Sequence, residues 1–209
     1  GYNFAMIQFN VLLGRLDQAE ALLLNGQQAV QPPMNQFLAF SEVMVFARKG
    51  DIERASTALE SARSVIEHFQ ADYLAFMLSL SAAEIANATG DYTAAGEHYK
   101  DAIAEANRSV FAAGLQEEQS IIYAACADAH IKAGELDLAQ RVLDYAFKRD
   151  SAEPDLWVAR AMLQEATGAP HMALASVNYA LAIWAEADPD YVHFQEALDL
   201  KQRLQASSR

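Results

Sequence analysis

The hydrophobic positions of this chain follow a pattern that restarts after five of its glycines. Small, aliphatic or aromatic residues recur two, five, nine and twelve positions after almost every one of them. These offsets fall on one stripe of a helix with about 3.6 residues per turn. The glycines are Gly14, Gly50, Gly90, Gly134 and Gly168. The pattern therefore predicts five amphipathic helices, each beginning just after a glycine.

The fifth position after each glycine is alanine in every case. An alanine lets a second helix approach closely, while Leu or Tyr at the ninth position can fill the space beside the contact. Successive glycines are 36, 40, 44 and 34 residues apart, within the roughly 33–47 residues of repeats built from helices. The alanines are Ala19, Ala55, Ala95, Ala139 and Ala173. The sequence therefore predicts a repeat of tightly packed helices.

A second amphipathic helix precedes each glycine, as in FLAFSEVMVFARK at residues 37–49. Each glycine is expected to end that helix in the left-handed conformation. An acidic residue follows three of the glycines, at Asp51, Asp91 and Glu135, where it favours a helix N-terminus. With prolines taken as breaks, the expected helices are 2–12, 15–30, 35–48, 51–69, 72–88, 91–109, 116–133, 136–149, 154–167, 170–186 and 190–205.

At GDYTAAGEHYKDAI, residues 90–103, the chain resembles the tetratricopeptide repeat family. That segment is similar to the second helix of the family's repeat, with Gly, an acidic residue, an aromatic residue and then Ala, Tyr and Ala. Seven positions before the glycine the family prefers Gly or Ala, and Ala83, Ala127 and Ala161 fit. The stretched spacings resemble the long, degenerate repeats of some bacterial multidomain regulators.

The resemblance implies an all-α fold. We expect a right-handed α-α superhelix, a solenoid of about five helix-turn-helix repeats with a C-terminal capping helix. We expect residues 1–209 to form a single solenoid domain. Since the chain starts without Met, we also expect it to be a fragment of a larger protein.

The amino-acid composition limits the kinds of partner that this chain can bind. With 28 acidic and 15 basic residues the formal charge is −13, which repels nucleic acid and favours basic partners. A single cysteine excludes an internal disulfide and a thiolate zinc cluster. No apolar run reaches the roughly 20 residues of a membrane span. We expect no cofactor, and a cytoplasmic location is favoured over a periplasmic one.

The sequence offers no group of residues for catalysis. None of the five histidines is three or four residues from another, the spacing that places two metal ligands on one helix face. Cys126 and His130 fall on a packed helix and are interpreted as core residues. His193 is interpreted as a surface residue. We therefore expect no enzymatic activity and no metal site.

The family resemblance places the first helix of each repeat on a concave, peptide-binding side. Projected onto this chain, that side is apolar in the second and third repeats and carries acidic residues beside them. The expected partner is a peptide or amphipathic helix with apolar anchors beside Lys or Arg. The residues expected to bind it are Phe37, Phe40, Met44, Met77, Leu80, Glu84, Asn87 and Asp128. Alternatively, these side chains pack only against adjacent helices or against another part of the protein.

The expected function is a non-catalytic protein-interaction scaffold. Two alternatives remain: a regulatory or sensor segment of a bacterial transcriptional regulator or cyclase, and an envelope-associated assembly scaffold. The full-length sequence discriminates between them. A flanking catalytic or DNA-binding domain indicates the regulator, and a lipoprotein signal indicates the envelope scaffold.

Overall fold

The computed structural model describes residues 2–108 and 116–207, and every regular element in them is helical. The chain forms two compact units, residues 1–113 and 114–209. The first unit contains α1 (Tyr2–Leu12), α2 (Leu16–Ala29), η1 (Met34–Leu38), α3 (Ala39–Lys49), α4 (Ile52–Phe69), η2 (Asp72–Leu74), α5 (Ala75–Ala88) and α6 (Tyr92–Arg108). The second contains α7 (Gln116–Lys132), α8 (Leu136–Arg149), α9 (Pro154–Ala166), α10 (Pro170–Ile183) and α11 (Val192–Ser207).

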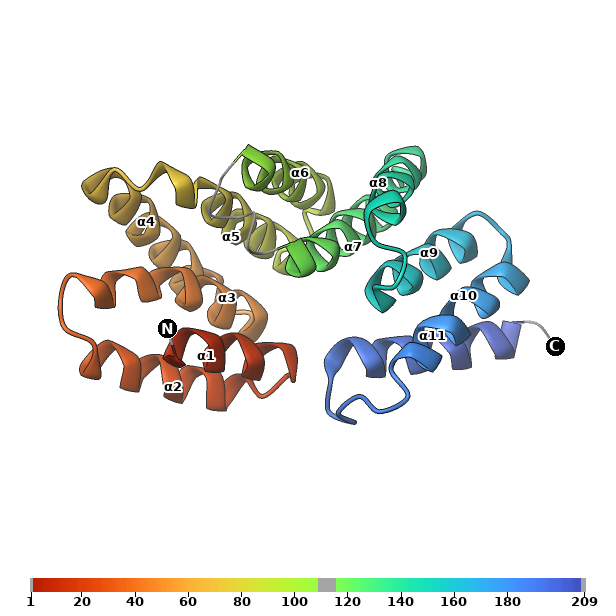
Figure 1. The fold of residues 1–209 in the computed structure, drawn as a ribbon, viewed down its shortest axis with the longest axis horizontal. Coiled ribbons are helices and arrows are strands. Elements are labelled where there is room, and N and C mark those ends of the chain that lie inside the picture. Colours follow the sequence, from red (N-terminus) through yellow and green to blue (C-terminus); the bar gives the residue numbers. More distant parts are fainter. Residues whose placement is uncertain (1, 109–115, 208–209) are drawn as a thin grey trace. The chain divides into compact units, whose positions relative to one another are not determined.

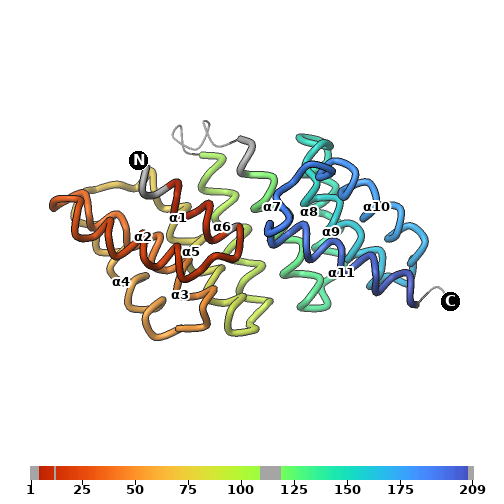
Figure 2. Tube along the Cα trace, turned by 90° about the horizontal axis from the view of Figure 1, so that it is seen from below, coloured from red at the N-terminus to blue at the C-terminus, as the bar shows by residue number. Residues whose placement is uncertain are grey.

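Consecutive helices pack as pairs (Figure 1). In the first unit the pairs are α1 with α2, α3 with α4, and α5 with α6, and the first helices of neighbouring pairs also touch. In the second unit α7 pairs with α8 and α9 with α10, while α11 packs on α10 and α9. The tube in Figure 2 shows the two helices of each pair running side by side. The all-α repeat expected from the sequence is thus confirmed.

The turn between paired helices is built from a left-handed glycine, as predicted. Gly50 has φ +77°, and the backbone N–H groups of Gly50 and Asp51 donate to the carbonyls of Ala47 and Phe46 at 3.0 and 2.9 Å. Asp51 then accepts a hydrogen bond from the backbone N–H of Arg54 at 3.2 Å. These contacts satisfy groups that both helix ends would otherwise leave unpaired. The other four glycines also have positive φ, at Gly14, Gly90, Gly134 and Gly168.

The repeated alanines lie in the helix seams. All five residues at the fifth position after a glycine are 0% exposed: Ala19, Ala55, Ala95, Ala139 and Ala173. The residues seven positions before each glycine are also 0% exposed: Ile7, Val43, Ala83, Ala127 and Ala161. Each helix therefore packs against its partner through small side chains on one or both sides of the contact. This result confirms the register of the repeat.

Each unit has its own hydrophobic core. In the first unit Ile7, Leu23 and Val45 are fully buried in a cluster contributed by α1, α2, η1, α3 and α4. In the second unit the apolar stripe of α11, including Leu200 and Leu204, packs into a cluster with residues of α9 and α10. Helix α11 thus covers the end of the α9–α10 pair, which fits the expected capping helix.

Two short 3₁₀ helices were not anticipated. Element η1 precedes α3 and η2 precedes α5, so the helices expected to start at residues 35 and 72 open with a 3₁₀ turn, as is common at helix N-termini. Helix α4 also ends without a glycine, because Gln70 takes the left-handed position with φ 51°. No helix in residues 2–108 and 116–207 is long and apolar enough to span a membrane.

Cys126 and His130 lie inside the second unit, as the sequence predicts. Cys126 is 1% exposed and His130 is 1% exposed on the same helix, α7. The His130 ring Nδ1 lies 2.7 Å from the Glu135 Oε2, at the turn into α8. This contact satisfies a buried polar group within the protein, so the histidine is a structural residue.

Candidate functional site

Five of the expected partner-binding residues keep part of their surface accessible to solvent in the first unit. The repeat register places them on the first helices of the second and third repeats, α3 with its leading turn η1, and α5. Phe37 and Met77 both lie thirteen positions before a glycine and so occupy equivalent places. We call this surface the α3/α5 face, and its residues, all intermediate in exposure, are Phe37, Met44, Met77, Leu80 and Asn87.

Two side chains of this face make contacts with neighbouring helices. The Phe37 ring packs on Phe69 at the end of α4, with 5.4 Å between ring centroids. The Gln8 side-chain amide of α1 points its Nε2 at the Met44 sulfur, 2.9 Å away. Thioether sulfur is a weak acceptor on a flexible side chain. Met44 can therefore change rotamer at low cost.

Phe40 and Glu84 do not belong to this accessible surface, and the sequence-based assignment is corrected for both. Phe40 is 2% exposed and Glu84 is 6% exposed. Glu84 Oε2 accepts from Arg48 Nε at 3.0 Å, and Glu84 Oε1 accepts from the Tyr99 hydroxyl at 2.9 Å. A buried carboxylate needs such partners, so Glu84 joins α3, α5 and α6 instead of facing a ligand.

The sequence pattern did not identify Arg48 as the partner of Glu84. The two residues lie 36 positions apart on neighbouring repeats, and nothing in either helix alone pairs them. The signal is visible only in the packing of α3 on α5. Arg48 therefore already neutralises Glu84, one of the charges that was expected to attract a basic ligand.

Asp128, the eighth expected residue, lies in the second unit on α7. It is half-buried, and its Oδ2 pairs with Lys132 Nζ at 2.6 Å, one turn along the helix. Its Oδ1 is buried and has no hydrogen-bond partner. The α3/α5 face is defined without it, because that face lies wholly in the first unit.

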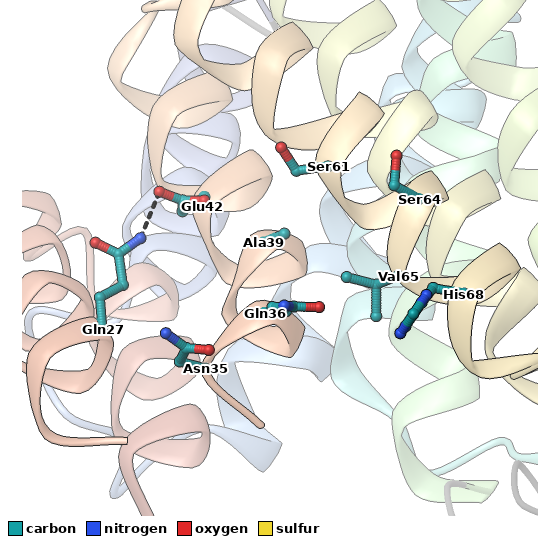
Figure 3. A pocket seen from close by; sticks show the side chains of 9 residues that line it. All are labelled: Gln27, Asn35, Gln36, Ala39, Glu42, Ser61, Ser64, Val65 and His68. Carbon is teal, nitrogen blue, oxygen red and sulfur yellow. Dashed lines mark hydrogen bonds between the residues drawn. The ribbon is translucent and has the colours of Figure 1, made fainter. Parts of the chain in front are cut away.

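Beside the α2 helix lies a pocket of about 610 Å³ whose lining residues are mostly polar (Figure 3). It was not anticipated, because its residues come from four elements and form no motif. Helix α2, η1, the start of α3 and the second half of α4 supply its walls. The lining residues are Gln27, Asn35, Gln36, Ala39, Glu42, Ser61, Ser64, Val65 and His68.

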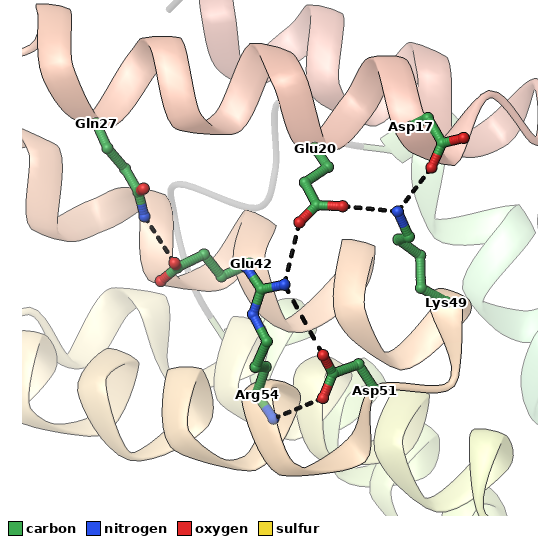
Figure 4. Close-up of polar contacts among 7 residues, drawn as sticks. All are labelled: Asp17, Glu20, Gln27, Glu42, Lys49, Asp51 and Arg54. Atoms are coloured by element: carbon green, nitrogen blue, oxygen red, sulfur yellow. Dashed lines mark hydrogen bonds and ion pairs between the residues drawn. The ribbon is translucent and has the colours of Figure 1, made fainter.

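An ion-pair network adjoins this pocket (Figure 4). Lys49 Nζ donates to Asp17 at 2.7 Å and to Glu20 at 2.6 Å, and these hydrogen bonds lower the pKa of both carboxyls. Arg54 Nη1 donates to Glu20 at 3.1 Å and lies 3.8 Å from Asp51. The network ties α2 to the α3–α4 pair and occupies both cations.

The second unit contains a partly buried polar cluster between α9 and the start of α11. Asp155 is 7% exposed, and its Oδ1 lies 2.5 Å from His193 Nδ1. The Tyr191 hydroxyl lies 3.5 Å from Asp155 Oδ2, and burial raises the pKa of this phenol. Burial, with the neighbouring Asp155, also raises the pKa of Glu153 to about 7. The interpretation of His193 as a surface residue is therefore wrong, since it links α11 to α9.

These groups do not assemble a metal site. Within the described part of the chain, no three His, Cys, Asp or Glu side chains are placed to hold an ion. The structure instead offers a half-exposed apolar face, a polar pocket and an interhelical cluster.

No family model matches the chain, and no curated protein matches it. Solved structures do. A tetratricopeptide repeat protein from Parabacteroides merdae ATCC 43184 superposes with a TM-score of 0.64 at 16% identity, covering 94% of this chain and 68% of that one. A chain of the APC/C hetero-tetramer Cut9-Hcn1 superposes with a TM-score of 0.50 at 15% identity, covering 97% of this chain and 42% of that one.

The helix pairs, the left-handed glycines and the alanine seams define the class. Together with these superpositions, they show that the chain has a tetratricopeptide-repeat-like, all-α fold. The likeness lies in the fold, because the identities are low.

Proposed function

We propose that this chain is a non-catalytic protein-interaction scaffold whose α3/α5 face binds a peptide or amphipathic helix. The observation that carries the proposal is that four apolar side chains of η1, α3 and α5 remain partly accessible to solvent: Phe37, Met44, Met77 and Leu80. Neighbouring apolar side chains that stay accessible to solvent are typical of binding sites. The Cut9-Hcn1 structure, which shares the fold, is itself a multiprotein assembly.

Shape and charge favour one kind of partner. Helical grooves accept amphipathic helices through apolar residues spaced along one face. Methionine, at Met44 and Met77, adapts to differently shaped anchors. The net charge of −13 favours a partner that carries Lys or Arg around those anchors. Apolar anchors would supply most of the affinity, and charge would mainly speed the encounter.

The test uses helical peptides selected for binding to the wild-type protein from a randomised library. Met77→Ser with Leu80→Ser is expected to weaken the selected peptides at least about tenfold while leaving the melting temperature nearly unchanged. The matched control is Leu24→Ser on α2, which removes a 46%-exposed leucine from outside the face. Unchanged affinity in the double variant would show that the face is not the site, and unfolding would show that it is core.

A further inference from the structure

The polar pocket in the first unit is rich in hydrogen-bond acceptors and holds one formal negative charge. Its lining includes Glu42 and no Lys or Arg. The Glu42 Oε1 accepts a hydrogen bond from Gln27 Nε2 at 2.6 Å. Among the described residues, Gln27 is the hydrogen-bond partner of this carboxylate. A carboxylate has about four lone-pair sites. Glu42 can therefore accept further donors from a molecule in the pocket.

The neighbouring cations do not reach this carboxylate. Lys49 is held by Asp17 and Glu20, and Arg54 by Glu20 and Asp51 (Figure 4). The local charge at Glu42 is thus left for a ligand to neutralise.

A second acceptor in the pocket is unsatisfied. The Asn35 Oδ1 is buried and accepts no hydrogen bond. A buried carbonyl without a donor destabilises the protein, which favours the binding of a donor there. Asn35 lines the pocket (Figure 3), so a donor in the pocket lies beside its amide group. The pocket therefore selects for a donor-rich cation.

We infer that this pocket binds an arginine side chain presented by another polypeptide. A guanidinium is planar, always charged, and carries five N–H donors and no acceptor. It can pair with the Glu42 carboxylate while donating to the Gln27, Gln36 or Asn35 amide oxygens, which come from two other elements. The ammonium of lysine offers three donors around a single point and cannot span such separated acceptors. A volume of about 610 Å³ accommodates the side chain with part of its backbone.

This site is separate from the α3/α5 face and does not depend on it. Glu42 and Met44 are two residues apart, which is about 200° around a helix. The contacts agree, since Glu42 bonds to Gln27 of α2 while Met44 is contacted by Gln8 of α1. Glu42 of the pocket and Met44 of the face therefore lie on opposite sides of α3. A protein partner could use either one alone.

The experiment titrates the ¹⁵N-labelled full chain with acetyl-arginine-amide and a blocked Gly-Gly-Arg-Gly-Gly peptide, followed by NMR. The expected result is saturable shifts at Gln27, Gln36 and Glu42, with a Kd on the order of 1 mM or tighter, as for one charge-assisted contact. Glu42→Gln, which keeps the shape and the bond to Gln27, should weaken binding about tenfold. Glu67→Gln, an exposed α4 residue outside the pocket, should leave it unchanged.

Three comparisons make the result decisive. Acetyl-lysine-amide and acetyl-citrulline-amide should bind at least about fivefold more weakly than the arginine probe. Ser64→Leu, which fills the pocket from an exposed α4 position, should abolish the shifts. This variant tests the pocket independently if Glu42→Gln fails to fold. Absence of shifts, or equal binding by Glu42→Gln and wild type, would overturn the inference. Tighter binding of free L-arginine than of the blocked peptide would replace the polypeptide ligand by a small molecule.

Discussion

At the scale of single residues, the seam alanines decide whether the helices can meet. Ala95 is fully buried on α6, and Ala104, nine residues later on the same helix, is exposed. The same side chain therefore has two different roles within one element. Substitution at the two positions separates packing from helix propensity.

Ala95→Arg is expected to lower the free energy of unfolding by about 3 kcal/mol or more, because it forces a large charged group into a packed seam. The matched Ala104→Arg should change it by less than about 0.5 kcal/mol. Urea unfolding followed by circular dichroism measures both. Equal midpoints for the two variants would contradict the seam assignment.

The residue scale also shows where sequence reasoning succeeds and fails. The alanines and glycines were identified because each acts through its own size or backbone preference, repeated five times. Phe40 and Leu80 occupy equivalent positions of the repeat, ten before a glycine, yet Phe40 is buried and Leu80 is half-exposed. Glu84 is paired with an arginine 36 residues away. Burial and long-range pairing depend on neighbours that a periodic pattern does not identify.

At the scale of elements, α11 is joined to α9 by polar contacts at two places. Arg203 donates to both Glu165 oxygens at 3.1 and 3.0 Å, and His193 lies against Asp155. Apolar burial of Leu200 and Leu204 supplies the rest of the contact. The ionisable groups at this junction make its stability depend on pH.

Glu153, at the start of α9, is the group of this junction whose raised pKa falls near neutral pH. Burial and Asp155 raise its folded-state pKa to about 7 from an ordinary 4.5. The contribution of Glu153 to the free energy of unfolding is therefore fully present below about pH 4.5 and is lost as the pH rises through about 7. The reason is that the carboxyl ionises at a lower pH in the unfolded chain than in the folded one. The titratable groups around it are Asp150, Asp155, Tyr191, His193 and Glu196.

Glu153→Gln is expected to stabilise the protein by about 1 kcal/mol at about pH 8, after allowance for solvent screening, and by little at about pH 5. Urea unfolding at the two pH values tests this, with Glu186→Gln, an exposed residue of the same unit, as the control. A difference that is the same at both pH values would rule out titration of Glu153 as the cause.

Helix boundaries could be predicted within a few residues, because left-handed glycines and prolines end helices through local backbone geometry. The short elements η1 and η2 could not, since three to five residues are too few to show a period. The end of α4 at Gln70 was placed within a residue by the pattern of apolar positions. Its left-handed backbone was not foreseen, because glutamine has no preference for that conformation.

At the scale of the whole molecule, the formal charge of −13 is a cost of folding. Compaction brings like charges together, whereas the ion pairs of Lys49 and Arg54 favour the folded state. Exposed ion pairs contribute about 0–1 kcal/mol each. Repulsion summed over the excess of acidic residues is therefore expected to outweigh them.

Raising NaCl from about 0.02 M to about 0.5 M should accordingly raise Tm by about 2–4 °C, since salt screens the net repulsion. Differential scanning calorimetry at constant pH measures the shift. Choline chloride at the same ionic strength controls for specific binding of sodium. A fall in Tm with salt would show that the attractive pairs dominate instead.

The chain's one cysteine lies on α7 at 1% exposure. Only a thiolate that reaches solvent reacts with an alkylating reagent, so labelling under native conditions requires α7 to separate from its neighbours. The rate of modification at low reagent concentration then measures the equilibrium constant of that local opening. Because no other thiol competes, the signal comes from the second unit alone. Cys126 is thus a natural reporter of how often that unit opens.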